Sequence, residues 1–418
     1  MSYFETKTIE ELTDTLIDYR GKTPEKTMEG VKLITAKVIK DGFIQEGNHE
    51  FIAEENYKSW MRRGLPKQWD ILITTEAPLG EVAQLRTPEK VALAQRVILL
   101  RGKSDLIDQG YYFQTFKSDF VQAELKSRGT GTTVLGIKQS ELLKVRIPYY
   151  PLPNQQKIAN ILSTYDDLLE NNNRRIRILE EMAQGIYRDW FVNFRFPGHE
   201  DVMMVESNLG LVPEGWHINK MSKIAILIKD SINPQKYPSE VFLHYSIPNF
   251  DQFHLPVETQ GIEIKSNKFV VRNGCILVSK LNPRIPRLWI LHSQENIRCI
   301  CSTEFLPLFP KSNELFEFIF FTCTSSEFKD KFSSLVGGTS TSHQRVKSED
   351  LLDMNICIPT SEIIKDFSKN IAPFLTTIEK IKIINQNLRH TRDLLLPKLI
   401  SGVIDVSDID IRITEAEA

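Results

Sequence analysis

Several short segments of this chain carry residues that could bind the phosphates and bases of a nucleic acid. Residues 57–69 hold four cations and two tryptophans and contain no acidic residue. Because Lys and Arg neutralise phosphates while aromatic rings stack on bases, this composition is typical of a nucleic-acid-binding loop. The alternative is a solvated helix face whose tryptophans pack inward. The candidate DNA contacts in this segment are Lys58, Arg62 and Arg63, beside Trp60 and Trp69.

Loops rich in small residues form a second group of candidates. Residues 129–133 read Gly-Thr-Gly-Thr-Thr and residues 337–342 read Gly-Gly-Thr-Ser-Thr-Ser, and a lysine follows each loop. Backbone amides and hydroxyls at this density can hold a phosphate, although an ordinary turn has a similar composition. Residues 20–24, Arg-Gly-Lys-Thr-Pro, form a basic loop rich in turn residues. The candidate DNA contacts in the three loops are Arg20, Lys22, Thr23, Thr130, Thr132, Lys138, Thr339, Thr341 and Lys347.

A third candidate segment stands out by its charge. Residues 265–294 contain six cations and no Asp or Glu, in a chain whose formal net charge is −2. A basic surface must therefore be local, and this segment is the clearest place for one. Its candidate DNA contacts are Lys280, Arg284 and Arg287. The alternative is a face that docks an acidic protein.

Motifs for catalysis are incomplete wherever they occur. The Gly-Lys-Thr and Gly-Lys-Ser runs at residues 21–23 and 102–104 lack the upstream glycine of a phosphate-binding loop. Residues 282–285, Asn-Pro-Arg-Ile, lack the second proline and the aromatic residue of an adenine methyltransferase motif. Residues 124–126 have the Glu-x-Lys of a nuclease without an upstream Pro-Asp. We therefore predict that the chain is not an enzyme and holds no metal or cofactor.

Two long helices should position these segments. Apolar residues from Ile158 to Trp190 recur at alternating four- and three-residue spacings, which indicates a coiled-coil seam. The same spacing recurs from Phe367 to Leu399. The first helix should be on the order of 50 Å long, at about 1.5 Å per residue. Pro373 should kink or restart the second helix.

The two seams belong to an internal repeat. Leu179 and Leu388 lie 209 residues apart, and the same lag aligns Gly129 with Gly338 and Lys138 with Lys347. We therefore expect an α+β fold of two globular domains, related by a pseudo-twofold axis and separated by two long antiparallel coiled-coil helices. The expected ranges are 1–153 and 197–361 for the globular domains, 154–196 and 362–402 for the helices, and 403–418 for a frayed tail.

The two seams also predict a register between the helices. If they overlap end to end, Ile158 faces Leu399 and Asn172 lies opposite Asn385. A buried Asn pair fixes register at a cost in stability. The alternative is that each Asn is solvated or contacts another subunit. Arg392 within the second seam indicates that part of that seam faces a partner or solvent.

Composition excludes several classes of protein. The chain has 418 residues, of which 41% are hydrophobic and 25% charged, as in a globular protein with more than one domain. No apolar stretch approaches membrane-spanning length and the first residues do not resemble a signal peptide, so we expect a cytoplasmic protein. The five cysteines lie in the second half without paired spacing. We expect them to be reduced and mostly buried.

Specific residues of the first helix and the first basic loop resemble a known family. Leu-Pro-Asn-Gln-Gln-Lys-Ile at residues 152–158, Leu-Glu-Glu-Met-Ala-Gln at 179–184, Trp190-Phe191 and the loop at 20–24 look like the specificity subunit of type I restriction-modification systems. The resemblance extends over essentially the whole chain. It implies two target-recognition domains that each read one half of a bipartite double-stranded DNA sequence, with the helices as a ruler. The second helix departs from the first, because it ends in Leu399-Ile400 where the first has Trp-Phe.

The resemblance also implies partners. Two methyltransferase (modification) subunits would pack on the helices, a translocating endonuclease (restriction) subunit would join them, and S-adenosylmethionine, ATP and Mg²⁺ would belong to these partners. The partner contacts would come from Tyr165, Leu179, Trp190, Phe191, Phe374, Leu388 and Arg392.

The expected dimensions are consistent with a split DNA target. A helix near 50 Å corresponds to roughly one and a half turns of DNA at about 34 to 36 Å per turn, so two heads at its ends would read half-sites with an unread spacer. Two other classes remain open. A self-contained DNA methyltransferase or nuclease is disfavoured by the incomplete motifs, and a coiled-coil scaffold or adaptor is disfavoured by the acid-free segment 265–294.

Overall fold

Two compact units make up the chain. The structure, a computed structural model, describes residues 5–19, 21, 23–45, 47, 49–131, 133–208, 210–291, 297–336 and 344–409, without the side chains of residues 252 and 253. Unit 1 comprises Met1–Asn173 and Ile383–Ala418, and unit 2 comprises Arg174–Lys382. Each long helix is therefore divided between the two units, whereas the expected ranges set the helices apart as separate segments.

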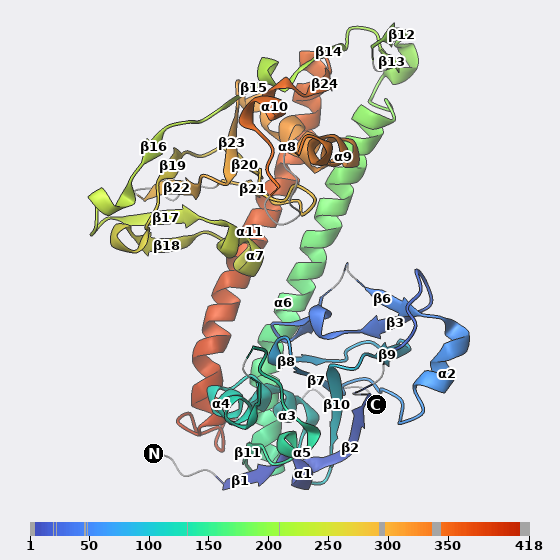
Figure 1. Ribbon diagram of the computed structural model, residues 1–418, viewed down its shortest axis with the longest axis vertical. Helices are drawn as coiled ribbons and strands as arrows, with labels where there is room; N and C mark the ends of the chain where they lie inside the picture. Colours follow the sequence, from blue (N-terminus) through green and yellow to red (C-terminus); the bar gives the residue numbers. More distant parts are fainter. Residues whose placement is uncertain are drawn as a thin grey trace. The chain divides into compact units, whose positions relative to one another are not determined.

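Unit 1 contains a mixture of strands and helices, which agrees with the expected α+β fold (Figure 1). Strands β2, β10, β7 and β8 form an antiparallel sheet in that order, and β6, β3 and β9 form a smaller sheet. The elements are β1 Glu5–Thr8, α1 Ile9–Leu12, β2 Thr13–Asp18, β3 Val31–Ile34, β4 Ile39–Lys40, β5 Phe43–Ile44, β6 Glu50–Ile52, α2 Tyr57–Trp60, β7 Ile71–Thr75, β8 Leu79–Gln84, β9 Val91–Leu93, β10 Val97–Gly102, α3 Gln109–Phe116, α4 Asp119–Arg128, α5 Gln139–Leu142 and β11 Arg146–Tyr149.

Unit 2 repeats this arrangement with additional strands. Strands β15, β23, β20 and β21 form an antiparallel sheet, and a five-stranded sheet has the order β16, β19, β22, β17 and β18. The elements are β12 Met204–Ser207, β13 Gly210–Pro213, β14 His217–Lys220, β15 Ala225–Leu227, β16 Ser231–Ile232, β17 Val241–Tyr245, α7 Ile247–Phe253, β18 Val257–Gln260, β19 Lys268–Val271, β20 Ile276–Ser279, β21 Leu288–Ile290, β22 Arg298–Ser302, β23 Phe305–Pro310, α8 Phe316–Thr324, α9 Ser326–Ser334, α10 Ser348–Asp353 and β24 Asn355–Ile358.

The element order confirms the internal repeat. In both four-stranded sheets the strand that comes first in the sequence pairs with the strand that comes last, β2 with β10 and β15 with β23. The two remaining strands then follow in sequence order, β7 and β8 in unit 1 and β20 and β21 in unit 2. A helix pair then follows the sheet, α3 and α4 in unit 1 and α8 and α9 in unit 2, and a two-stranded ladder closes each unit. The break within each helix pair also recurs: the hydroxyl of Ser118 caps α4 and that of Ser325 caps α9. The pseudo-twofold relation between the units stays a prediction.

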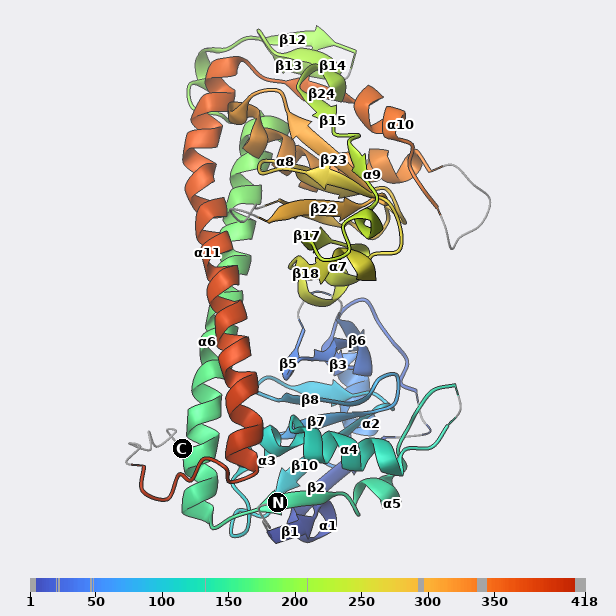
Figure 2. The same ribbon diagram turned by 90° about the vertical axis from the view of Figure 1, so that its left-hand side faces the viewer.

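The two long helices form as the seams predict. Helix α6 spans Leu152–Tyr187 and continues into a π-helical turn, Arg188–Val192, while α11 spans Ser361–Ile400 (Figure 2). The expectation that Pro373 restarts the second helix is wrong, because α11 runs through it for 40 residues without a break. The hydroxyl of Thr377 donates to the Pro373 carbonyl at 2.7 Å, within the next turn.

Side-chain contacts within each unit show that the helices are antiparallel. In unit 1 the amide of Asn172 donates to Asn385 Oδ1 at 2.9 Å, and both residues are buried, so the predicted pairing is confirmed. The amide of Asn385 in turn donates to Asn173 Oδ1 at 2.9 Å. In unit 2, Glu180 and Lys382 form an ion pair at 3.4 Å.

Each helix end is part of the hydrophobic core of a unit. Ile158, Leu162 and Leu399 are buried in unit 1 in one cluster with aromatic residues of α3. Phe191 and Phe367 are buried in unit 2, with ring centroids 4.8 Å apart. The aromatic end of the first helix is therefore part of the core of unit 2, and burial of these seams stabilises the units as well as the coil.

The segment after α11 is packed against unit 1. The ammonium of Lys157 donates to the carbonyls of Val406 and Ser407, and Val406 is buried. The expectation of a frayed tail is therefore wrong for residues 403–409, and residues 410–418 lie outside the described part. All five cysteines lie within the described residues as thiols, and four are buried. Among the described residues, no helix is long and apolar enough to cross a membrane.

Candidate nucleic-acid interface

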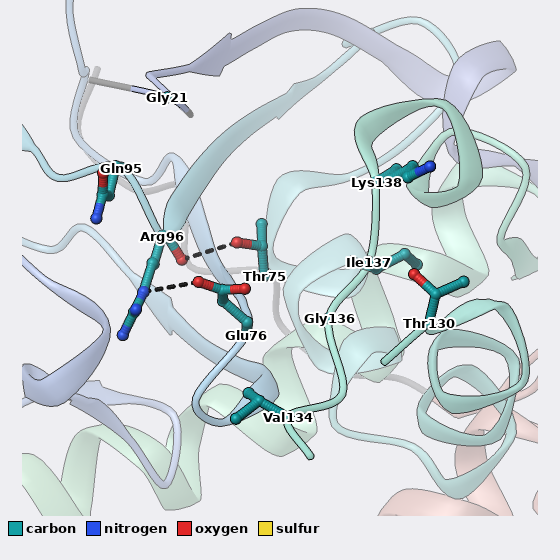
Figure 3. A pocket seen from close by; sticks show the side chains of 10 residues that line it. All are labelled: Gly21, Thr75, Glu76, Gln95, Arg96, Thr130, Val134, Gly136, Ile137 and Lys138. Carbon is teal, nitrogen blue, oxygen red and sulfur yellow. Dashed lines mark hydrogen bonds and ion pairs between the residues drawn. The ribbon is translucent and has the colours of Figure 1, made fainter. Parts of the chain in front are cut away.

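A cavity of about 330 Å³ in unit 1 brings together two of the loops singled out from the sequence (Figure 3). Gly21 comes from the basic loop 20–24, and Thr130 and Lys138 come from the small-residue loop and the residues after it. The remaining lining residues are Thr75, Glu76, Gln95, Arg96, Val134, Gly136 and Ile137. Segments far apart in the sequence thus converge on one polar hollow.

Backbone hydrogen bonds hold the walls of this cavity. The N–H of Thr75 at the end of β7 donates to the Arg96 carbonyl at 3.0 Å, and the Thr75 carbonyl accepts from Ile137 at 3.0 Å. Thr130 and Gly136 exchange two backbone hydrogen bonds that close the small-residue loop. A Cβ at Gly136 would lie 3.3 Å from Glu76, so the glycine allows the loop to approach this side chain. The cavity is therefore built on paired backbone.

The side chains of the cavity offer donors and acceptors of several kinds. Arg96 Nε lies 2.7 Å from Glu76 Oε1, with both side chains about half exposed (Figure 3). The hydroxyl of Thr23 donates to Gln95 Oε1 at 3.0 Å, which ties the basic loop to the cavity. Lys138 is exposed where α5 begins. A guanidinium, an amide and an ammonium on one rim can contact both base edges and phosphates.

Unit 2 contains the same backbone framework. The N–H of Lys280 donates to the Glu304 carbonyl at 3.0 Å, and the Lys280 carbonyl accepts from Val346 at 3.1 Å. Lys280, Glu304 and Val346 thus occupy the places of Thr75, Arg96 and Ile137. Lys347 is exposed at the start of α10, as Lys138 is at the start of α5.

Five of the predicted contacts lie outside the described residues. These are Arg20, Lys22, Thr132, Thr339 and Thr341.

The basic segment 57–69 combines a structural part and an exposed part. The indole N–H of Trp60 donates to the Leu93 carbonyl at 3.0 Å and its ring stacks on Tyr19, so this tryptophan packs inward as in the alternative interpretation. Arg63 donates to the Asp18 carbonyl and lies over the Tyr19 ring. Lys58 and Arg62 are exposed, and Trp69 is 44% exposed. The exposed residues remain available to a ligand.

The acid-free segment 265–294 is not a uniform cationic face. Arg287 forms a bidentate ion pair with Asp251 at 2.6 and 2.8 Å, and only 10% of its side chain is exposed. The prediction that Arg287 is an exposed DNA contact is therefore wrong for this structure, because an acid outside the segment neutralises it. Lys268 is also buried, Lys280 is partly buried, and Arg284 is exposed.

Several predicted partner contacts are instead internal. Phe191 is buried in the core of unit 2, where Trp190 also packs on Phe367 with ring centroids 5.8 Å apart. Arg392 is buried, with 9% of its side chain exposed, so the expectation that it faces solvent is wrong. Among the other predicted contacts, Tyr165, Leu179, Phe374 and Leu388 are partly buried. The long helices also carry exposed apolar side chains outside the predicted seams, namely Leu168, Ile178 and Met182 on α6 and Ile383, Ile384 and Leu394 on α11.

Arg392 belongs to a buried charge cluster that joins three elements of unit 1. Its Nη1 lies 2.8 Å from Asp166 Oδ1, while Lys117 Nζ lies 2.9 Å and the Gln114 amide 2.7 Å from Asp166 Oδ2. Burial raises the pKa of the Asp166 carboxyl, but the charges of Lys117 and Arg392 more than offset it and hold that pKa below its usual value. Burial lowers the pKa of Lys117 to about 8.

The described residues contain no group of three or more His, Cys, Asp or Glu side chains arranged to hold a metal ion. Lys117 and Arg392 also line a cavity of about 420 Å³ in unit 1. Because the charges of the cluster are paired, we interpret it as a structural network that positions the helices.

Comparison with known proteins gives a consistent picture. Residues 1–181 match the family model of the type I restriction modification DNA specificity domain. Over 389 residues, 88% of this chain and 84% of the relative, the chain is 27% identical to the type I restriction enzyme MjaIX specificity subunit of Methanocaldococcus jannaschii. It is 22% identical over 409 residues to the MjaVIII specificity subunit of the same organism, covering 94% of this chain and 91% of that one.

A solved structure shows a similar fold. The S subunit of a type I restriction-modification system from M. genitalium matches with a TM-score of 0.55 and 16% sequence identity, over 95% of this chain and 96% of that chain.

Proposed function

From the membership of this chain in the family of type I restriction-modification specificity subunits, we infer that it selects the DNA sequence on which such a system acts. Unit 1 would read one half of a bipartite target and unit 2 the other half. The observation that carries this proposal is the cavity of unit 1, where two loops predicted to bind DNA meet on one rim. The same framework recurs in unit 2 with an exposed lysine at the same place.

The proposed contacts divide into two kinds. Lys138 and Lys347 are exposed ammonium groups beside polar backbone, which suits them to phosphates and hence to affinity. The cavity side chains, such as Gln95 and Arg96, suit base edges and hence sequence selection. Lys58 and Arg62 extend the basic surface of unit 1.

We propose that methylation and cleavage are the work of partner subunits. The chain would be non-catalytic, and two methyltransferase subunits and a translocating endonuclease subunit would bring S-adenosylmethionine, ATP and Mg²⁺. The exposed apolar residues Leu168, Ile383 and Leu394 give the long helices of unit 1 a surface that a partner could cover. Because such a complex would act on DNA inside the cell, we also propose that the chain is cytoplasmic.

Salt-dependent binding tests the DNA contacts. The complex that contains this chain is purified by means of a tag on the chain, and its binding to a long DNA duplex of random sequence is measured. We expect Lys138→Gln and Lys347→Gln each to weaken this binding. Each phosphate contact releases counterions, so each change should lower the slope of log affinity against log salt concentration by about one. Fluorescence anisotropy over a salt series measures this slope.

Lys365→Gln is the matched control, because Lys365 is an exposed cation on α11 that pairs with Glu314. It should leave the slope unchanged. Equal slopes for the wild-type protein and both lysine variants would contradict the proposal and favour a scaffold that joins two protein-binding domains.

A further inference from the structure

One half-exposed arginine–glutamate pair occupies the rim of the cavity in unit 1. Arg96 precedes β10 and Glu76 follows β7, and the Nε edge of the guanidinium faces the carboxylate at 2.7 Å. About half of each side chain is exposed, at 49% for Arg96 and 42% for Glu76. Figure 3 shows the end of the Arg96 guanidinium directed away from the glutamate.

Unit 2 has a pair of the same kind, built from different positions. Arg345 Nε lies 2.9 Å from Glu304 Oε2, and the exposed fractions are 47% and 27%. Glu304 is equivalent to Arg96, because its carbonyl accepts from the N–H of Lys280 as the Arg96 carbonyl accepts from the N–H of Thr75. Arg345 is equivalent to Gly136, because Arg345 forms a β-bridge with Leu281, the residue after Lys280, and Gly136 forms one with Glu76, the residue after Thr75.

In unit 2 the acid thus occupies the position equivalent to Arg96, and the arginine occupies the position equivalent to Gly136. An arginine–glutamate pair is nevertheless present in both units. Stability does not explain its presence in both units, because exposed ion pairs contribute about 0 to 1 kcal/mol. A geometric role does explain it. A carboxylate on the Nε edge fixes the plane of a guanidinium and leaves its other edge for a planar ligand.

We propose that Arg96 and Arg345 each read a guanine in the half-site of their own unit, with Glu76 and Glu304 as positioning residues. Two N–H groups of a guanidinium match O6 and N7 of guanine in the major groove, and this bidentate contact discriminates strongly between bases. The proposal rests on the proposed function, since it assigns base readers within the two recognition units. Arg96 and Arg345 occupy non-equivalent positions of the shared backbone framework, so the guanine would lie at a different place in each half-site.

Substitution by lysine and by alanine separates base reading from phosphate binding. Lysine keeps the charge that a phosphate needs but loses the planar pair of donors, whereas alanine loses both. In the host, with the full chain expressed from its own locus, methylated motifs are mapped genome-wide by long-read sequencing. We expect Arg96→Lys and Arg96→Ala both to make one G·C position of one half-site degenerate, with discrimination there falling about 5- to 150-fold.

The half-site of the other unit is the internal control, and it should keep its sequence because unit 2 is unchanged. Arg345→Lys should do the reverse. Glu76→Gln should loosen the same position as Arg96→Lys, while Asp167→Asn, which removes an exposed acid elsewhere in unit 1, should not.

Three results would overturn the proposal. An unchanged motif with Arg96→Lys and uniformly weaker methylation with Arg96→Ala would show a phosphate contact. An unchanged motif and unchanged methylation with both would show a surface ion pair only. A degenerate A·T position would exclude guanine. If the wild-type chain itself supports no motif, the proposed function fails, and the wild-type sample shows this separately from the variants.

Discussion

A single carboxylate, Asp166 on α6, contacts side chains from two other elements of unit 1. It is 1% exposed and contacts Lys117 from the end of α3 and Arg392 from α11. Two buried cations around one anion are tolerable only while the anion is charged, because an unpaired buried charge is costly. The cluster therefore fixes how α6 and α11 pack on the sheet domain.

Removing that charge should destabilise unit 1. We expect Asp166→Asn to lower its free energy of unfolding by about 3 to 5 kcal/mol, because Lys117 would stay buried without a counter-charge and Arg392 would keep only Asp393, whose side chain is 61% exposed. Hydrogen exchange of α3 and of the adjoining parts of the long helices measures this loss locally, which matters because a chain with two units need not unfold in one step.

Asp167→Asn is the matched control, since Asp167 is the next residue and its side chain is 63% exposed beside Arg86. It should cost at most about 1 kcal/mol, as Arg86 keeps a second partner in Glu170. The sign of the pH dependence follows from the lowered pKa of Asp166. The stability that the ionised Asp166 carboxyl contributes should be fully present above its pKa in the unfolded chain, about 3.9, and should be lost as pH falls through its lower pKa in the folded protein. Equal protection in both variants would contradict the account.

The residue scale also shows where sequence reasoning succeeds and fails. The loops around Gly21, Thr130 and Lys138 could be singled out because their small and basic residues cluster in the sequence. Arg96 and Gln95 could not, because nothing local marks them and only the fold brings them to the rim. Arg287 and Arg392 were misjudged for one physical reason: each finds an acid far away in the sequence, and local charge patterns do not record such pairs.

At the scale of elements, the long helices are the most predictable part of the chain. Their seams follow from side-chain spacing, and antiparallel overlap correctly placed Asn172 against Asn385. Helices α8 and α9 were missed, since Phe316–Thr324 is apolar on nearly every side and lacks the one-faced pattern of a surface helix. The cap at Ser325 is the signal that could have revealed α9.

The paired asparagines make a prediction about energy. A single Asn172→Leu or Asn385→Leu change should cost about 1 to 3 kcal/mol, because it leaves Asn385 Oδ1 or the Asn172 amide, respectively, buried without its partner. The double variant should cost clearly less than the sum, since both polar groups are then gone. Hydrogen exchange of the long helices around residues 172 and 385 measures the cycle locally.

Ile178 lies outside the seam, on the exposed face of α6, so Ile178→Leu serves as the control and should be nearly neutral. Additive costs in the double variant would show that the two amides do not depend on each other. The coiled-coil register would then rest on apolar packing alone.

At the scale of the whole molecule, the proposed reading of two half-sites rests on the internal repeat. Both units have the same order in their four-stranded sheet, the same helix pair and the same framework around the candidate site. The residues at equivalent positions of this framework differ, with Thr75, Arg96 and Gly136 in unit 1 and Lys280, Glu304 and Arg345 in unit 2. Two similar scaffolds with different residues at these positions suit the proposed reading of two different half-sites.

The central claim is that this chain gives a restriction-modification system a two-part DNA target. The most direct measurement is a genome-wide map of N6-methyladenine in the host, with the gene present, deleted and restored. We predict that deletion abolishes one motif made of two short specified parts around an unspecified spacer, and that restoration recovers it. An unchanged map, or the loss of an unsplit motif, would contradict this account.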